Sequence, residues 1–308
     1  MSETKKMLFI FNPKAGKAQI KMHLLGIVDT FVKAGYQVET YPTQSPKDAI
    51  EYTKNRAAEF DMVVCSGGDG TLDEVVAGLL QSGVKIPLGY VPAGSTNDFA
   101  GSLKLPKTML KAAKVAVEGA EFACDIGSFN EQTFVYIAAF GIFTDVSYGT
   151  QQELKNLLGH MAYLLEGIKS LSTIKSYPMK FSYDDKVVEG DFIYGMITNS
   201  MSVGGFKGFT GPGIELNDGL FEVTLVRTPS TVAELNDLIT ALLNRDFGGD
   251  MLIHFKTDKM RVESGQEVDW TLDGEYGGGH WQLLIENKKE AVTLKVPEKF
   301  VKETQKNR

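Results

Sequence analysis

Short apolar runs alternate with helical apolar patterns along the first 126 residues of the chain. The runs predict strands at residues 7–11, 37–41, 60–64, 87–91 and 122–126. Helices are predicted between them, at residues 22–34, 45–59, 72–80 and 109–118. Because alternating strands and helices build a parallel sheet, ligands are expected at the carboxyl ends of the strands. Four strand-end loops should therefore face one crevice, those at Asn12, Thr43, Gly67 and Gly94.

The pattern changes after residue 127 to short strand-like runs with turn residues between them. They lie at residues 134–140, 179–183, 187–195, 220–227, 251–256, 260–263, 270–273 and 282–285. Asp184 and Asp185 predict a hairpin turn between two of them. Helical spacing interrupts the runs at residues 154–171 and 231–243, and residues 302–308 are typical of a frayed, charged tail. We therefore predict an α/β domain followed by an antiparallel β-sandwich domain.

The amphipathic stretch at residues 154–171 has two interpretations. Its leucines, with Met161 and Ile168, suit packing on the sandwich or shallow insertion into a bilayer. Packing in the core is the favoured interpretation.

Composition narrows the class of protein. The chain has 308 residues and a formal net charge of −7, which argues against binding to nucleic-acid phosphates. Cys65 and Cys124 lie in apolar runs, without zinc-ligand spacing, and are expected to be buried free thiols. Residues 7–11 are too short for a signal sequence, and the longest uncharged apolar run, at residues 133–144, is too short to span a membrane. We expect a cytoplasmic protein that can still touch a membrane surface.

The stretch from Cys65 to Glu74 places glycines where a strand turns into a helix. Such a turn presents free backbone N–H groups and the positive end of a helix dipole to an anion. Asp69 in its middle would repel a bare phosphate but could hold Mg²⁺ beside one, because this cation prefers oxygen ligands. The alternative is an ordinary tight turn between a strand and a helix.

The loop from Pro92 to Asp98 adds hydroxyl and amide side chains at the next strand end, which suits contacts to phosphate or ribose. Its alternative is a capped helix start with Ser95 or Thr96 as N-cap.

Together these motifs resemble a known family. Gly67 to Thr71, followed by Gly94 to Asp98 and preceded by Asn12 to Gly16, resembles the catalytic domain of the diacylglycerol, sphingosine and ceramide kinases. The segments at residues 216–222 and 273–278 look like two later motifs of the soluble bacterial diacylglycerol kinases. The implied fold, shared with NAD kinases, is a Rossmann-like α/β nucleotide-binding domain with a C-terminal antiparallel β-sandwich. The domains would be residues 1–127, joined by residues 288–308, and residues 128–287, with the lipid entering between them.

The resemblance also implies a set of site residues. Glu275 would be the general base, and Asp69 would help to position a catalytic Mg²⁺ through a charged network with Asp98, Asp125 and Lys17. Contacts to ATP are implied for Asn12, Pro13, Lys14, Ala15, Gly16, Thr43, Gly67, Gly68, Asp69, Gly70, Thr71 and Ser95. A structural Mg²⁺ is implied at Asp218, with backbone carbonyls from Glu215 and Leu220.

The implied reaction is transfer of the ATP γ-phosphoryl group to the hydroxyl of diacylglycerol, giving phosphatidic acid. The enzyme would contact the inner face of the membrane transiently and could form a homodimer. The alternatives are another lipid alcohol, such as phosphatidylglycerol or a long-chain base, then NAD as acceptor, and finally a non-catalytic nucleotide- or lipid-binding protein. Three positions depart from the family pattern, namely Asp73 for an asparagine, Ser95 for a threonine and Gly101 for an arginine.

Overall fold

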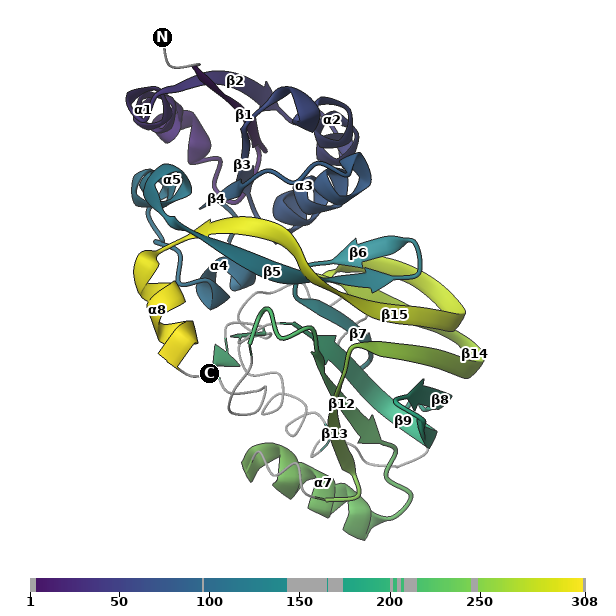
Figure 1. Cartoon of the computed structure of the whole chain (residues 1–308). Coiled ribbons are helices and arrows are strands. Elements are labelled where there is room, and N and C mark those ends of the chain that lie inside the picture. Colours follow the sequence, from purple (N-terminus) through teal and green to yellow (C-terminus); the bar gives the residue numbers. More distant parts are fainter. Residues whose placement is uncertain are drawn as a thin grey trace. The chain divides into compact units, whose positions relative to one another are not determined.

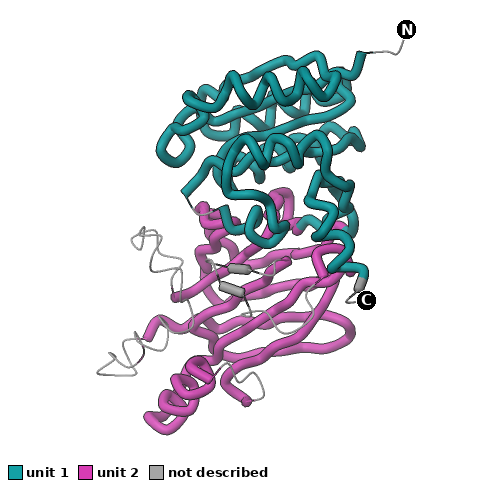
Figure 2. The backbone as a smooth tube through the Cα atoms, turned by 90° about the vertical axis from the view of Figure 1, so that its left-hand side faces the viewer, with its two compact units in different colours: residues 1–126, 289–308 teal, residues 127–288 magenta. Residues whose placement is uncertain are grey.

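The computed structural model describes residues 4–95, 97–142, 165, 174–199, 202–203, 206–207, 215–244 and 249–306. The chain divides into two compact units (Figure 2). Unit 1 consists of Met1–Ile126 and Lys289–Arg308, and unit 2 of Gly127–Lys288. Two long strands, β5 (Ala120–Phe129) and β15 (Glu275–Val296), run through both units. The amphipathic stretch predicted at residues 154–171 falls almost entirely outside the described residues.

Unit 1 is built on a parallel sheet with the strand order β2-β1-β3-β4, continued by the carboxyl end of β15, where Leu294 pairs with Leu88. Helices cover both faces of this sheet (Figure 1). Alternate residues of each strand point to opposite faces, so Met7 and Phe9 pack against the α1 and α5 side. The four strands are β1 (Lys5–Phe11), β2 (Tyr36–Pro42), β3 (Met62–Gly67) and β4 (Leu88–Pro92).

The predicted helices of unit 1 are present with small shifts at their ends. The helix expected at residues 45–59 ends as an α-helix at Arg56 and continues as the single turn η1 (Ala57–Glu59). Helix α8 (Glu298–Lys306) was not predicted, and α4 (Asp98–Ser102) begins where a helix start was only the alternative interpretation. The others are α1 (Ile20–Lys33), α2 (Asp48–Arg56), α3 (Asp69–Ser82) and α5 (Met109–Glu118).

The prediction of a frayed tail at residues 302–308 is wrong for most of that segment, because α8 extends to Lys306. Phe300 holds this helix in place. Its side chain is 2% exposed and meets Phe122 of β5 edge to face, with ring centroids 5.0 Å apart. Burial of one aromatic side chain thus orders a segment whose composition is otherwise that of a solvated tail.

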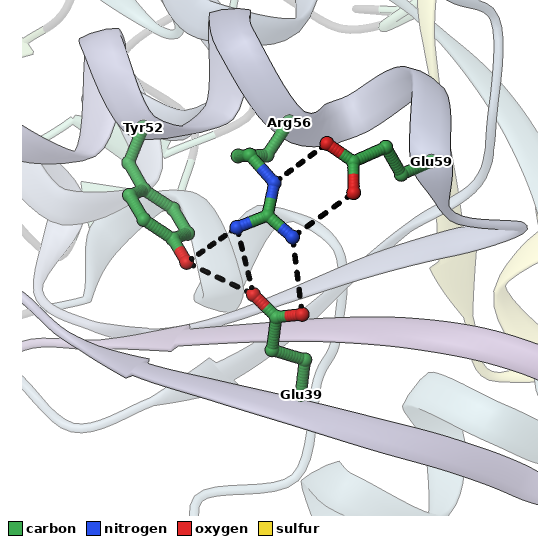
Figure 3. Close-up of polar contacts among 4 residues, drawn as sticks. All are labelled: Glu39, Tyr52, Arg56 and Glu59. Atoms are coloured by element: carbon green, nitrogen blue, oxygen red, sulfur yellow. Dashed lines mark hydrogen bonds and ion pairs between the residues drawn. The ribbon is translucent and has the colours of Figure 1, made fainter.

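A cluster centred on Arg56 fixes α2 against β2 (Figure 3). The guanidinium donates to both oxygens of Glu59, at 2.7 and 3.0 Å, and pairs with Glu39 of β2 at 3.0 Å. The hydroxyl of Tyr52 donates to Glu39 at 2.9 Å, and its ring stacks on Tyr41 with centroids 3.4 Å apart. The hydrogen bonds from Arg56, with a further effect of its charge, lower the pKa of Glu59. The cluster holds the end of β2 in place.

Unit 2 is an antiparallel β structure, as predicted. Strands β7 and β8 follow one another end to end between β9 and β14. Each of them pairs with β9 on one side and with β14 on the other. Beyond β9 the sheet continues to β12 and β13, and beyond β14 to the part of β15 in this unit. The strands are β6 (Gln132–Phe134), β7 (Ile137–Gly141), β8 (Tyr177–Tyr183), β9 (Lys186–Thr198), β10 (Ser202–Val203), β11 (Phe206–Lys207), β12 (Phe221–Arg227), β13 (Leu252–Thr257) and β14 (Lys259–Leu272).

The sheet of unit 2 folds back over its own core. Phe134 of β6 stacks on Phe221 of β12, with ring centroids 5.5 Å apart, although β12 follows β9 on one side of the sheet and β6 joins the other side through β5 and β15. The two layers so formed enclose an aromatic core that includes Phe140 and Trp270. Helix α7 (Val232–Asn244) packs its leucines on a second cluster in this unit. The predicted turn at Asp184 and Asp185 is present, with φ of 44° and 58°.

Candidate functional site

The strand-end loops of unit 1 begin side by side. Phe11 at the end of β1 pairs with Pro42 of β2 and Ser66 of β3, and Gly67 pairs with Pro92 of β4. Backbone bonds extend this register into the loops, since the amide of Asn12 donates to Ser66 and that of Thr43 to Phe11, both at 2.9 Å. The loops therefore begin at one edge of the sheet in unit 1, as expected, and that they face one crevice stays a prediction.

Glycines allow the loops after β3 and β4 to touch. The Gly67 carbonyl accepts hydrogen bonds from the amides of Ala93 at 2.7 Å and Gly94 at 3.1 Å. A Cβ at Gly94 would lie 2.5 Å from the Cα of Gly68, which is closer than any side chain tolerates. Gly16, at φ +54°, likewise packs against the Ala93 carbonyl. The three glycine-containing loops thus form one backbone surface.

Two side chains lock this surface. Asn97, at φ 54°, accepts from the Gly94 amide at 2.9 Å and donates to its carbonyl at 2.7 Å. The hydroxyl of Tyr90 donates to the Gly67 carbonyl at 3.2 Å. Asn97 occupies the N-cap position of α4, so the interpretation of Ser95 as N-cap is wrong, and Thr96 lies outside the described residues. Ser95 is exposed instead.

Asp69 is the first residue of α3 and is half-buried. Its Oδ2 accepts a hydrogen bond from the amide of Asp98 at 3.0 Å. Its Oδ1 is buried and has no hydrogen-bond partner among the described residues. Burial raises the pKa of this carboxyl to about 6, the nearby charge of Asp98 adds to the rise, and the amides of Asp98 and Phe99 oppose it.

This carboxylate fits a magnesium ion. An unsatisfied, buried oxygen beside backbone amides suits a hard cation, which commonly takes one or two carboxylates and completes its shell with water and substrate phosphates. No cluster of three acidic, histidine or cysteine side chains suited to a metal occurs in the described part of the chain. Asp69 offers one carboxylate oxygen that such a cation would share with oxygens of bound phosphates.

Glu74 acts one turn further along α3. Its two carboxylate oxygens accept hydrogen bonds from the amides of Lys47 at 2.8 Å and Ala49 at 3.2 Å. It thereby caps α2, whose own N-cap residue makes no side-chain hydrogen bond. Glu74 therefore has a structural role, because it links α3 to the start of α2, a few residues after Thr43.

Replacing Glu74 by glutamine should destabilise the protein by about 1–2 kcal/mol, because an amide side chain can accept only one of the two hydrogen bonds. Amide hydrogen exchange should become faster at Lys47 and Ala49, and urea unfolding should report the loss of stability. Glu51→Gln, at an exposed position of α2, is the matched control. Unchanged exchange at Lys47 and Ala49 would contradict the capping role.

In unit 2, Asp273 and Gly274 form the tight turn between β14 and β15, with φ of 51° and 87°. The carboxylate of Asp273 is buried and accepts three backbone hydrogen bonds. These come from Val135 at 2.6 Å, Ile137 at 2.9 Å and Tyr136 at 3.0 Å. Glu275, which pairs with Leu272 across the turn, is exposed at the start of β15. Asp273 therefore anchors the turn on which Glu275 is exposed.

Asp218 suits a metal less well. Its Oδ1 accepts from the amide of Leu220 at 2.9 Å, and its Oδ2 lies 3.7 Å from the Lys256 ammonium. Lys256 also pairs with the buried Glu222 at 2.6 Å, and His254 approaches the same glutamate at 3.1 Å. The carboxylate charge at Asp218 is thus partly compensated already, and a structural Mg²⁺ at Asp218, Glu215 and Leu220 stays a prediction.

Comparison with known proteins finds relatives over most of the chain. Residues 6–129 match the family model of the diacylglycerol kinase catalytic domain. Diacylglycerol kinase from Bacillus subtilis (strain 168) is 34% identical over 276 residues, covering 89% of this chain and 91% of the relative. The enzyme of that name from Staphylococcus carnosus (strain TM300) is 33% identical, covering 89% and 90%.

The chain belongs to the diacylglycerol kinase family. A crystal structure of a putative diacylglycerol kinase from Bacillus anthracis str. Sterne superposes with a TM-score of 0.78 at 26% identity, over 96% of this chain and 98% of that one. The chain is thus a lipid kinase, and the predicted fold class is confirmed. In the described part of this kinase, no helix is both long enough and apolar enough to cross a bilayer.

Several features of the kinase escaped the sequence analysis. Tyr90, Glu74 and Asp273 act through hydrogen bonds to backbone groups that lie 23, 27 and 138 positions away. Spacing along the chain reports none of these pairings. A buried tyrosine in a strand and an aspartate in a turn each have a common structural explanation, so their signal was weak.

Proposed function

We propose that this kinase transfers the γ-phosphoryl group of ATP to the free hydroxyl of diacylglycerol. The observation that carries the proposal is the buried Asp69 carboxylate at the start of α3, with an unpartnered Oδ1 beside the glycine loops. The names of the relatives, each a diacylglycerol kinase, support the choice of acceptor.

The binding of ATP is assigned to the loop surface of unit 1. The turn from Gly67 to Thr71 at the N-terminus of α3 would bind the phosphates, because first-turn amides and the helix dipole favour anions there. The Thr71 amide already donates to the Gly68 carbonyl at 3.1 Å, so Thr71 would contribute through its hydroxyl. Asn12 to Gly16, Thr43 and Ser95 would complete the nucleotide contacts. Asp69 would hold Mg²⁺, which supplies neutralisation of phosphate charge during transfer.

Glu275 would accept the proton of the attacking hydroxyl. A primary alcohol needs such an acceptor as its oxygen bonds to phosphorus and the bond to the β-phosphate oxygen breaks. An exposed carboxylate on a turn anchored by Asp273 suits this role, since nothing in the described part of the chain covers it from an approaching hydroxyl. The products are phosphatidic acid and ADP.

Transfer of labelled γ-phosphate from ATP, with Mg²⁺, to a panel of acceptors tests the proposal. The panel is diacylglycerol, phosphatidylglycerol, sphingosine and NAD, with each lipid in detergent micelles. We expect label in phosphatidic acid and little elsewhere. Preferred labelling of another acceptor would replace diacylglycerol as the substrate, and hydrolysis of ATP without labelled lipid would overturn the proposed reaction.

A further inference from the structure

Helix α1 is apolar on two sides, which is unusual for a helix that lies on a protein surface. Its inner side buries Ile20, Ile27 and Phe31 against the sheet of unit 1. Its outer side exposes Met22 by 76% and Leu25 by 83%. Val32, two turns beyond Leu25, is 55% exposed.

The neighbouring helix α5 extends this apolar surface. Leu110 is 44% exposed and lies against Gly26 of α1, so close that a Cβ at Gly26 would be 3.0 Å from its Cδ2. The two helices lie together on one side of the sheet of unit 1 (Figure 1). We call the exposed side of these helices the α1/α5 face, with Met22, Leu25, Val32 and Leu110 as its apolar residues.

The same face is basic on a chain whose net charge is −7. The acidic residues of the two helices are already paired, Asp29 with Lys33 at 2.6 Å and Glu118 with Lys114 at 3.6 Å. The exposed lysines of the two helices outnumber these two carboxylates and are Lys21, Lys33, Lys111 and Lys114, with Lys107 two residues before α5. Apolar side chains set among lysines are the composition of helices that lie on anionic lipid surfaces.

We propose that the α1/α5 face docks this kinase on the anionic surface of a lipid bilayer. The inference rests on the proposed function, since a substrate held in a bilayer requires the enzyme to reach that surface. Leucine and methionine would enter the boundary between head groups and acyl chains, while the lysines meet lipid phosphates. A second copy of the chain fits this face less well than a bilayer does. Two-fold pairing of the α1/α5 face with itself would bring lysines against lysines.

Sedimentation with vesicles, without ATP or diacylglycerol, tests the face separately from the reaction. We expect binding to vesicles of phosphatidylcholine with phosphatidylglycerol, weak binding to phosphatidylcholine alone, and loss of binding at high salt. Leu25→Glu and the double variant Lys111→Gln/Lys114→Gln should each reduce binding about tenfold or more. Lys54→Gln/Lys85→Gln, which removes two exposed lysines outside the face, is the matched control.

Kinase activity measured on two forms of diacylglycerol distinguishes an error in the docking proposal from an error in the proposed reaction. On a short-chain, water-soluble diacylglycerol the face variants should match the wild type, and on vesicles containing long-chain diacylglycerol they should lose activity in step with binding. Vesicle binding that the face variants share equally with the wild type would overturn the proposal. A dimer in light scattering that Leu25→Glu converts to a monomer would assign the face to a second copy instead.

Discussion

Asp69→Asn should abolish phosphoryl transfer and at the same time make the ligand-free protein more stable at neutral pH. The loss of activity follows from removing the carboxylate proposed to hold Mg²⁺, and should be at least about 100-fold. The gain in stability follows from burial, because the ionised carboxylate lies out of water with its Oδ1 unpartnered among the described residues. An amide carries no charge that needs solvation.

The size of the stability gain in Asp69→Asn depends on pH. The folded-state pKa of Asp69 is raised from 3.8 to about 6, so between these values the folded chain holds a proton that the unfolded chain has lost. The contribution of Asp69 to stability therefore falls as pH rises through this window. Above pH 6 the ionised carboxylate costs the folded state about 2–3 kcal/mol.

Thermal unfolding of both proteins between pH 4 and pH 8 measures this effect. The melting temperature of Asp69→Asn should exceed that of the wild type by several degrees at pH 7.5, and the difference should shrink towards pH 4. Mg²⁺ with ATP should stabilise the wild type far more than the variant. Asp237→Asn, at an exposed position of α7, is the control and should show no pH-dependent difference. A variant less stable than the wild type at pH 7.5 would contradict the unfavourable burial of this charge.

Much of unit 1 was predictable because each of its elements carries its own signal. The strands of the sheet are short apolar runs bounded by turn residues, and α5 was predicted with the bounds that the structure has. The carboxyl ends of these strands then had to meet, since parallel strands in one sheet share an edge. The glycines and Asp69 at that edge could therefore be grouped from the sequence alone.

Strand β15 shows where such prediction fails. Only residues 282–285 were predicted as a strand, whereas β15 spans Glu275–Val296. Its first residues include three consecutive glycines, and its middle includes the polar run from Glu286 to Glu290, so apolar alternation is lost at both places. Hydrogen bonds to β14 hold the first part in the sheet. Partners that lie elsewhere in the chain, rather than local propensity, make this segment a strand.

Two substitutions in the turn at the start of β15 should affect stability differently, although they lie two residues apart. Glu275→Gln should reduce phosphoryl transfer by about 10²- to 10⁴-fold, which is the usual contribution of a general base. Stability should not change, because Glu275 is exposed and its carboxylate makes no hydrogen bond in the part of the chain that the structure describes. Urea unfolding and the transfer of labelled phosphate measure the two effects.

Asp273→Asn should instead destabilise the fold by about 2–4 kcal/mol. The buried carboxylate accepts three amide hydrogen bonds, and an asparagine would turn an NH₂ group towards at least one of those donors. Activity should fall as well, because the turn that presents Glu275 loses its anchor. Transfer measured well below the unfolding temperature should then recover partly in Asp273→Asn but not in Glu275→Gln. Equal stability of the two variants would contradict the anchoring role, whereas full activity of Glu275→Gln would remove Glu275 as the base and leave the anchor untouched.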